Sequence, residues 1–260
     1  MRPEVDRLGK DSAQELRLRL GKPPVLILKE RCVMLSGLAE QEDLSFAVNT
    51  ACRYSPWLAE TMAEGYLTAP GGHRIGICGE TVVKEGSISG IRNMRSLNIR
   101  IARDFPGVAK PLAGINGNIL LLGPPGSGKT TLLRDLIRLR SHCETVAVAD
   151  ERGEIFPQGL AEGHNVDILT GCSKPKGIEI LLRTMSPDTI AVDEITAQAD
   201  CDALLQTIWC GVHVLATLHG NTIEDLRSRR VYRPILETGL FDTLVILRRD
   251  KSFRTERLKL

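Results

Sequence analysis

The segment Gly123-Pro-Pro-Gly-Ser-Gly-Lys129-Thr130 has the residue types and the spacing of a phosphate-binding loop, Gly-x4-Gly-Lys-Thr. It directly follows the apolar run Ile119–Leu122, so we expect a strand before the loop and a helix after it. Glycines let successive backbone N–H groups turn toward phosphate oxygens, and the start of the helix adds the positive end of its dipole. The sequence therefore predicts a site for a nucleoside triphosphate, with Lys129 at the β- and γ-phosphates and the Thr130 hydroxyl on Mg²⁺. The expected binding residues are Gly123, Pro124, Pro125, Gly126, Ser127, Gly128, Lys129, Thr130 and Thr131.

Two carboxylates end another apolar run, Thr189-Ile-Ala-Val-Asp193-Glu194, which has the Walker B pattern. Mg²⁺ on phosphates is typically held by one or two carboxylates and by waters, so Asp193 is a candidate metal residue. Glu194 is a candidate general base for the attacking water. The alternative is a plain exposed acidic end of a strand, which the preceding phosphate-binding loop disfavours.

An acidic box, Asp150-Glu151-Arg152-Gly153-Glu154, places three carboxylates within five residues after a further apolar run. Glu151 and Glu154 are candidate catalytic residues that bind metal or orient water. Capping of the next helix or pairing with arginines are the structural alternatives.

A histidine and a group of arginines complete the set of candidates. His219 ends the run Ala216-Thr-Leu-His and can sense the γ-phosphate through a hydrogen bond, although a lone histidine is usually structural. Arg92, Arg95, Arg100 and Arg103 lie close together in the sequence. One of them can act as an arginine finger, including on the nucleotide of a neighbouring subunit, or all can belong to a solvated basic strand.

These residues need a scaffold that brings strand ends together. Short apolar runs separated by helical segments predict a parallel sheet covered on both faces. Because open α/β sheets bind ligands at the carboxyl ends of their strands, we expect the polar clusters to meet at one edge. The expected strands are Ile119–Leu122, Thr145–Ala149, Thr189–Val192, Val212–Thr217 and Thr243–Leu247.

The pattern changes near residues 104–112, where two prolines and a glycine indicate a boundary. We expect a smaller α+β domain over residues 1–104, a linker over 105–112 and the α/β domain over 113–260. In the first domain, a capping-box pattern at Ser12 and Glu15 predicts a helix over Ser12–Leu20. Further expected elements are a helix over Glu42–Arg53, strands over Val25–Leu28 and Cys32–Leu35, a hairpin of Tyr66–Thr68 and His73–Cys78 around Gly71-Gly72, and short strands near Val82 and Ile88.

Composition sets broader limits. The 260 residues include 42% hydrophobic and 25% charged residues, as in ordinary globular chains. Scattered cysteines without a Cys-x-x-Cys pair favour reduced thiols in a cytosolic protein over disulfides or a zinc site. A membrane span needs roughly 18 consecutive apolar residues, and no run approaches that length, so any membrane association would run through a partner.

The order of the motifs resembles that of the type II/IV secretion ATPase superfamily. It consists of the phosphate-binding loop, the acidic box, Leu182–Asp188 leading into the Walker B strand, and a Thr-Leu-His box. Within this superfamily the chain is similar to the stage III sporulation protein AA family. The segments that carry this similarity are Gln14–Pro24, Gly71–Arg74, Ser96–Ala102, Gly171–Gly177, Met185–Asp188, Val192–Ile195 and His219-Gly220.

The resemblance implies a RecA-like P-loop NTPase domain in a cytoplasmic ATPase that forms a hexameric ring. Such a ring would associate peripherally with membrane-embedded channel or secretion proteins and energise a channel between mother cell and forespore. It also implies phosphate and Mg²⁺ roles for Lys129 and Thr130, and roles for Glu151 or Glu154, Glu194 and His219. The chain departs from the usual Gly-Glu-Ile-Arg and Glu-Asp-Pro-x-Glu patterns at Asp193–Thr196 and Asp150–Glu154. Both departures leave the general base open between Glu194 and Glu151.

The mechanism that we expect is Mg²⁺-dependent hydrolysis between subunits, with domain opening and closing about the linker. A nucleic-acid-dependent RecA-like ATPase is the alternative. The net charge of +2 and an aromatic content of 4% disfavour it, because single-strand grooves combine basic channels with stacking rings. The absence of an Asn-Lys-x-Asp stretch disfavours a GTPase. A small-molecule kinase is disfavoured because the expected N-terminal domain shows no obvious acceptor pocket in its sequence. A degenerate ATPase with a purely structural role is a further alternative.

Overall fold

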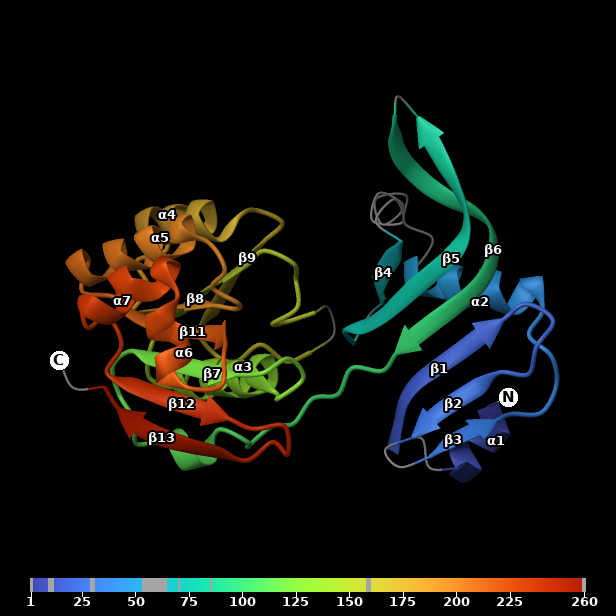
Figure 1. Cartoon of the computed structure of the whole chain (residues 1–260), viewed down its shortest axis with the longest axis horizontal. Helices are drawn as coiled ribbons and strands as arrows, with labels where there is room; N and C mark the ends of the chain where they lie inside the picture. Colours follow the sequence, from blue (N-terminus) through green and yellow to red (C-terminus); the bar gives the residue numbers. More distant parts are fainter. Residues whose placement is uncertain are drawn as a thin grey trace. The chain divides into compact units, whose positions relative to one another are not determined.

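The structure, a computed structural model of the chain, describes residues 2–8, 12–28, 31–52, 65–69, 71–84, 86–157 and 160–258. The chain divides into two compact units. One consists of Met1–Arg103 with Pro157–Leu160, and the other of Asp104–Phe156 with Ala161–Leu260 (Figure 1). Among the helices that are described, none is long and apolar enough to span a bilayer.

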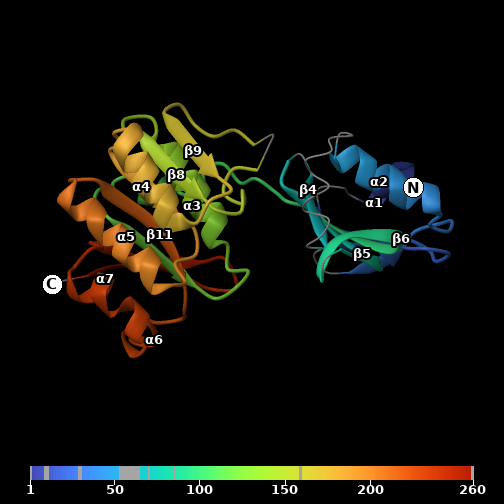
Figure 2. The same ribbon diagram turned by 90° about the horizontal axis from the view of Figure 1, so that it is seen from above.

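The N-terminal unit is built on a six-stranded antiparallel sheet in the order β3-β2-β1-β6-β5-β4. Its elements are α1 (Arg2–Leu8), β1 (Ala13–Arg19), β2 (Val25–Leu28), β3 (Cys32–Met34), α2 (Gln41–Cys52), β4 (Tyr66–Ala69), β5 (His73–Lys84) and β6 (Ser87–Arg100). The apolar side of α2, with Leu44 and Val48, packs against Ile77 and Leu97 of the sheet. Figure 2 shows α2 on one face of the β5–β6 pair.

The helix predicted over Ser12–Leu20 is wrong, because Ala13–Arg19 forms an interior strand of this sheet. Leucines at positions 16, 18 and 20 alternate with charged residues at 15, 17 and 19, which is the period of a strand. This alternation outweighs the capping-box spacing of Ser12 and Glu15. The helix predicted over Glu42–Arg53 is observed as α2, although Arg53 lies outside the described residues. The strand predicted over Cys32–Leu35 ends one residue earlier, at Met34.

The predicted hairpin around Gly71-Gly72 is observed as the antiparallel pair β4 and β5. Both glycines have a left-handed backbone, with φ of 82° and 80°. The short strands expected near Val82 and Ile88 are parts of the longer strands β5 and β6.

The C-terminal unit contains a seven-stranded sheet in the order β13-β12-β7-β11-β10-β8-β9. Among the pairs described, only β12–β13 is antiparallel. The strands are β7 (Ile119–Gly123), β8 (Val146–Asp150), β9 (Val166–Thr170), β10 (Thr189–Val192), β11 (His213–His219), β12 (Thr243–Leu247) and β13 (Phe253–Arg257). A mixed α/β fold with a mostly parallel sheet is therefore confirmed.

Helices cover both faces of this sheet. The helices are η4 (Lys110–Leu112), α3 (Lys129–Arg140), α4 (Lys174–Thr184), α5 (Gln198–Trp209), α6 (Ile223–Ser228), η5 (Arg230–Tyr232) and α7 (Arg233–Glu237). On one face α3 packs against inward side chains such as Leu121 and Val148. On the other face α4, α5, α6 and α7 pack against side chains such as Leu122 and Val192. Alternate side chains of each buried strand thus pack against the helices on opposite faces of the sheet.

All five strands predicted in this region are observed, with ends shifted by no more than two residues. The pattern did not predict the edge strands β9 and β13. Val166–Thr170 is half-buried, and Phe253–Arg257 is mostly charged and exposed, so neither forms an apolar run. Residues 105–112, which the sequence predicts to be a linker, lie within the C-terminal unit, where Ala109 and Leu112 are buried.

Candidate functional site

The phosphate-binding loop connects β7 to α3, and its backbone depends on glycine. Gly126 and Gly128 have φ of 71° and 97°, which other residues rarely adopt. A Cβ atom on Gly123 would lie 2.5 Å from Ser127 Oγ, so only glycine allows this close approach. The loop is thereby shaped by residue types that the sequence singled out.

Two features of the loop leave polar groups available to a ligand. No side chain caps the N-terminus of α3, which begins at Lys129 after Gly128. N–H groups in the first turn of a helix lack intrahelical partners. The hydroxyl of Ser127 is buried and has no hydrogen-bond partner. Thr131 follows in the same first turn and is partly buried.

Lys129 is buried and folds back onto the loop. Its ammonium donates to the carbonyl oxygens of Gly123 at 2.9 Å and Pro124 at 3.1 Å. It also lies 2.9 Å from Nδ1 of His219. Burial lowers the pKa of Lys129, while the negative charges of Asp193 and Glu194 act in the opposite direction.

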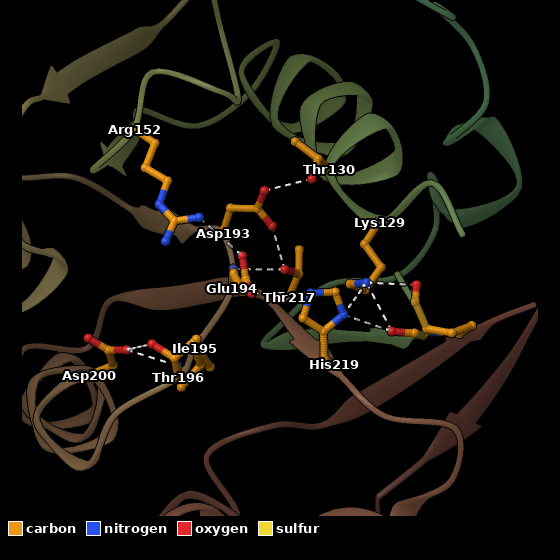
Figure 3. Close-up of polar contacts among 12 residues, drawn as sticks. Lys129, Thr130, Arg152, Asp193, Glu194, Ile195, Thr196, Asp200, Thr217 and His219 are labelled. Atoms are coloured by element: carbon orange, nitrogen blue, oxygen red, sulfur yellow. Dashed lines mark hydrogen bonds and ion pairs between the residues drawn. The ribbon is translucent and has the colours of Figure 1, made fainter. Parts of the chain in front are cut away.

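Asp193 follows β10 and lies against the start of α3 (Figure 3). Its Oδ2 accepts a hydrogen bond of 2.6 Å from the Thr130 hydroxyl, and its Oδ1 accepts one from the Thr217 hydroxyl. The two residues that the sequence proposed for Mg²⁺ are therefore in direct contact. Parallel pairing of β10 with β11, which joins Val192 to Ala216, brings Thr217 beside Asp193.

Glu194 has a left-handed backbone, with φ of 55°. Its N–H donates to the Thr217 hydroxyl at 2.8 Å, which holds this conformation in place. The following Ile195 N–H donates to the Thr217 carbonyl at 2.9 Å. The Glu194 carboxylate lies 3.2 Å from Nε2 of His219 and 3.9 Å from Arg152.

His219 connects the Walker B glutamate to the lysine of the loop. Since Lys129 donates to Nδ1, the partners assign the proton of the neutral imidazole to Nε2, which donates to Glu194. In this tautomer the 3.4 Å contact of Nδ1 with the Gly123 carbonyl is not a hydrogen bond. The arrangement forms a continuous path from Glu194 through His219 to Lys129 (Figure 3).

The residues of the acidic box have different surroundings. Asp150 is buried and accepts the N–H groups of Glu154 at 3.0 Å and Ile155 at 2.8 Å, so it holds the loop that follows β8. Glu151 pairs with Lys174 at 2.6 Å. A cavity of about 130 Å³ joins this box to the end of β10. Its lining residues are Ala149, Asp150, Glu151, Arg152, Glu154, Lys174, Asp193, Glu194 and Thr196.

The arginines of the N-terminal unit have partners within that unit. Arg92 and Arg95 lie 3.4 and 3.9 Å from Glu80, and Arg100 lies 3.6 Å from Glu15. Arg103 donates to the Ala13 carbonyl at 2.7 Å. The first three side chains are 71%, 76% and 65% exposed, so their ion pairs are solvated and exchangeable. An arginine finger among them stays a prediction.

Sequence reasoning missed Thr217 and Arg152 as members of the site. Thr217 had a usable signal, because residues two apart in a strand point to the same face and Thr217 precedes His219 by two. Arg152 was visible within the acidic box, but its approach to Glu194 depends on the loop after β8.

Comparisons with known proteins give a consistent result. The family model for sporulation stage III, protein AA matches residues 4–256. Stage III sporulation protein AA of Bacillus subtilis (strain 168) is 38% identical over an alignment 256 residues long, and the match covers 92% of this chain and 83% of that protein.

Solved structures extend the likeness to the fold. The pilus retraction motor PilT with bound ADP aligns with a TM-score of 0.67 at 14% identity, over 99% of this chain and 83% of PilT. The Legionella pneumophila ATPase DotB aligns with a TM-score of 0.59 at 18% identity, over 97% of this chain and 78% of DotB. At these identities the similarity concerns the fold.

Proposed function

The chain belongs to the sporulation stage III protein AA family, and we propose that it is a Mg²⁺-dependent ATPase. The proposed active site lies where β7, β8, β10 and β11 end. The observation that carries the proposal is the contact of Thr130 with Asp193, which joins two motifs 63 residues apart. The folds of PilT, solved with bound ADP, and of the ATPase DotB support the same reaction class.

The chemistry of the loop fits a triphosphate and its metal. The uncapped start of α3 and the unpartnered Ser127 hydroxyl provide donors for phosphate oxygens. Nowhere in the described part of the chain do three His, Cys, Asp or Glu side chains gather as metal ligands. Mg²⁺ commonly takes few protein ligands and keeps several waters, so Thr130 and Asp193 suffice to hold it. When bound, Mg²⁺ would supply positive charge that stabilises the phosphate oxygens.

In the proposed reaction, Lys129 exchanges its carbonyl partners for the β- and γ-phosphates. Glu194 accepts a proton from water, and the water oxygen bonds to the γ-phosphorus as the bond to the β–γ bridging oxygen breaks. ADP and phosphate leave, and the proton returns from Glu194 to solvent. His219 orients Glu194 through its Nε2–H and links this carboxylate to the lysine.

We extend the proposal to assembly on the strength of the superfamily resemblance. A ring of identical subunits would place an arginine of one copy, chosen among Arg92, Arg95 and Arg100, at the nucleotide of the next. The ring would then energise a membrane channel or secretion complex between mother cell and forespore.

Hydrolysis by a lysine variant tests the site assignment. We expect Lys129→Ala to release phosphate from Mg-ATP about 100-fold more slowly than the parent protein, because the transition-state charge loses the ammonium group of the loop. Lys176→Ala is the matched control, since Lys176 is an exposed lysine that pairs with Glu179 on α4. Equal rates for Lys129→Ala and the parent protein would refute the proposed site.

A further inference from the structure

The turn between β12 and β13 lies directly beside the phosphate-binding loop. Strand β12 runs parallel to β7, with Ile246 paired to Leu122, so both strands end at the same edge. A Cβ atom on Gly123 would lie 3.1 Å from the Cβ of Leu247, which shows how closely the two strand ends approach. The chain that leaves β12 must therefore pass along the loop.

This turn has a fixed shape. The Lys251 N–H donates to the Arg248 carbonyl at 3.1 Å, and the Arg248 N–H donates to the Ser252 carbonyl at 2.9 Å. Asp250 accepts both the N–H and the hydroxyl of Ser252, at 3.0 and 2.6 Å. Lys251 has a left-handed backbone, with φ of 72°. A non-glycine residue is unfavourable at such a position, and residues of this kind cluster at functional sites.

The side chain of Lys251 reaches the loop. Its ammonium donates a hydrogen bond to the Gly126 carbonyl, 125 residues away in the sequence. Its Cδ would lie 3.7 Å from a Cβ atom on Gly128, so the aliphatic part runs along the loop. The peptide group after Gly126 is then held at both ends, because the Ser127 N–H donates to the Pro124 carbonyl at 3.2 Å.

We propose that Lys251 is a positioning residue of the nucleotide site. By fixing the Gly126–Ser127 peptide, it keeps the loop in the shape that receives phosphates, and its ammonium adds positive charge at the outer side of the loop. The inference rests on the proposed ATPase function and assigns a second lysine to the proposed nucleotide site. Lys129 contacts phosphate from within the loop, whereas Lys251 acts through the backbone from outside.

Substitutions at Lys251 separate this role from hairpin stability. Glycine accepts a left-handed backbone without strain, so Lys251→Gly keeps the turn and removes the ammonium. We expect this variant to unfold at or above the temperature of the parent protein and to bind Mg-ATP about tenfold more weakly in calorimetric titrations. Lys251→Arg retains a cationic donor, and its dissociation constant should stay within about twofold of the parent value.

The control variant is Arg257→Met. Arg257 pairs with Thr243 at the far end of the same hairpin, and its substitution should leave Mg-ATP binding unchanged. Parent-like binding by Lys251→Gly would overturn the inference, as would weaker binding accompanied by a lower unfolding temperature. Lys129→Ala distinguishes the two proposals. If this variant loses Mg-ATP binding while Lys251→Gly retains it, only the proposed role of Lys251 is refuted. Parent-like Mg-ATP binding by Lys129→Ala would refute the proposed nucleotide site itself.

Discussion

Glu194 combines an unfavourable backbone conformation with three polar neighbours. A left-handed conformation costs a non-glycine residue on the order of 1 kcal/mol, and here the Thr217 hydroxyl holds it through the Glu194 N–H. The result is a carboxylate that faces His219 and Arg152 at the end of β10. Glu151 is instead engaged by Lys174 at 2.6 Å. We therefore propose Glu194 over Glu151 as the general base.

Paired amide variants test this choice. We expect Glu194→Gln to lower kcat for ATP hydrolysis by about 100-fold or more, because an amide cannot accept the water proton, with Mg-ATP binding retained. Glu151→Gln should lower kcat by less than about tenfold, since it disturbs an ion pair at the rim of the cavity. Steady-state phosphate release at saturating Mg-ATP measures kcat for both variants. The reverse order of effects would assign the base to Glu151.

At the residue scale, motif spacing singled out Thr130 and Asp193 as candidate Mg²⁺ residues, and the structure places their side chains in contact. A hydroxyl after the phosphate-binding lysine and a carboxylate after a strand are the groups that typically hold Mg²⁺ at a nucleotide. Each of the two residues follows an apolar run in the sequence. The contacts of Thr217, Arg152 and Lys251 were not predictable in the same way. The contacts of Thr217 and Lys251 depend on strand order and on the register of β10 with β11 and of β12 with β7, which link segments far apart in the sequence. The contact of Arg152 depends on the loop after β8 and on the pairing of β8 with β10.

Helix α3 connects the phosphate-binding loop to two other segments of its unit. Asp135 accepts the N–H groups of Gly107 at 3.0 Å and Ala109 at 2.7 Å. Arg138 donates to both carboxylate oxygens of Asp104, at 2.9 and 2.7 Å. Arg134 donates to the carbonyls of Glu154 and Ile155 after the acidic box. One helix thus holds the start of the unit and the acidic loop together.

Removing the Asp104 charge should destabilise this arrangement. Burial alone would raise the pKa of Asp104, but hydrogen bonds from Arg138, the charges of Arg138 and Arg134, and the Phe105 N–H together lower it. We expect Asp104→Asn to lower the free energy of unfolding by about 1–3 kcal/mol in urea titrations at pH 7. Glu179→Gln, at an exposed ion pair on α4, is the control and should change it little.

The pH dependence follows from the same shift. A carboxylate whose pKa is lower in the folded state contributes stability above its ordinary value of 3.8, and this contribution is lost as pH falls through the lowered value. The difference in the free energy of unfolding between the parent protein and Asp104→Asn should therefore shrink as the pH falls below 3.8 and through the lowered pKa of Asp104. A difference that persists unchanged in acid would contradict the role of the charge.

At the scale of elements, buried strands were the most predictable because they read as uninterrupted apolar runs. The edge strands β9 and β13 were not, since exposure lets charged residues replace the apolar ones. Strand β1 was misassigned because a local capping pattern competed with a period of two. For the segment 105–112 the sequence showed prolines and a glycine, whereas the burial of Ala109 and Leu112 depends on α3.

The whole molecule combines two units that each have their own sheet. The proposed catalytic groups Lys129, Asp193 and Glu194 all lie in the C-terminal unit, and the candidate finger arginines lie in the other. Asp104 and Ala109 are hydrogen-bonded to side chains of α3, so the segment from Asp104 through the predicted linker belongs to the C-terminal unit. In the proposed ring, assembly with other copies would decide which arginine reaches a nucleotide.

We propose that ATP binds with its phosphates in the loop between β7 and α3. The most direct measurement is a cryo-electron microscopy structure of Glu194→Gln with Mg-ATP. We expect phosphate oxygens against the N–H groups of Gly126 and of residues 128–130, with the Lys129 ammonium turned toward them and Asp193 beside the metal. A triphosphate bound away from this loop would contradict it.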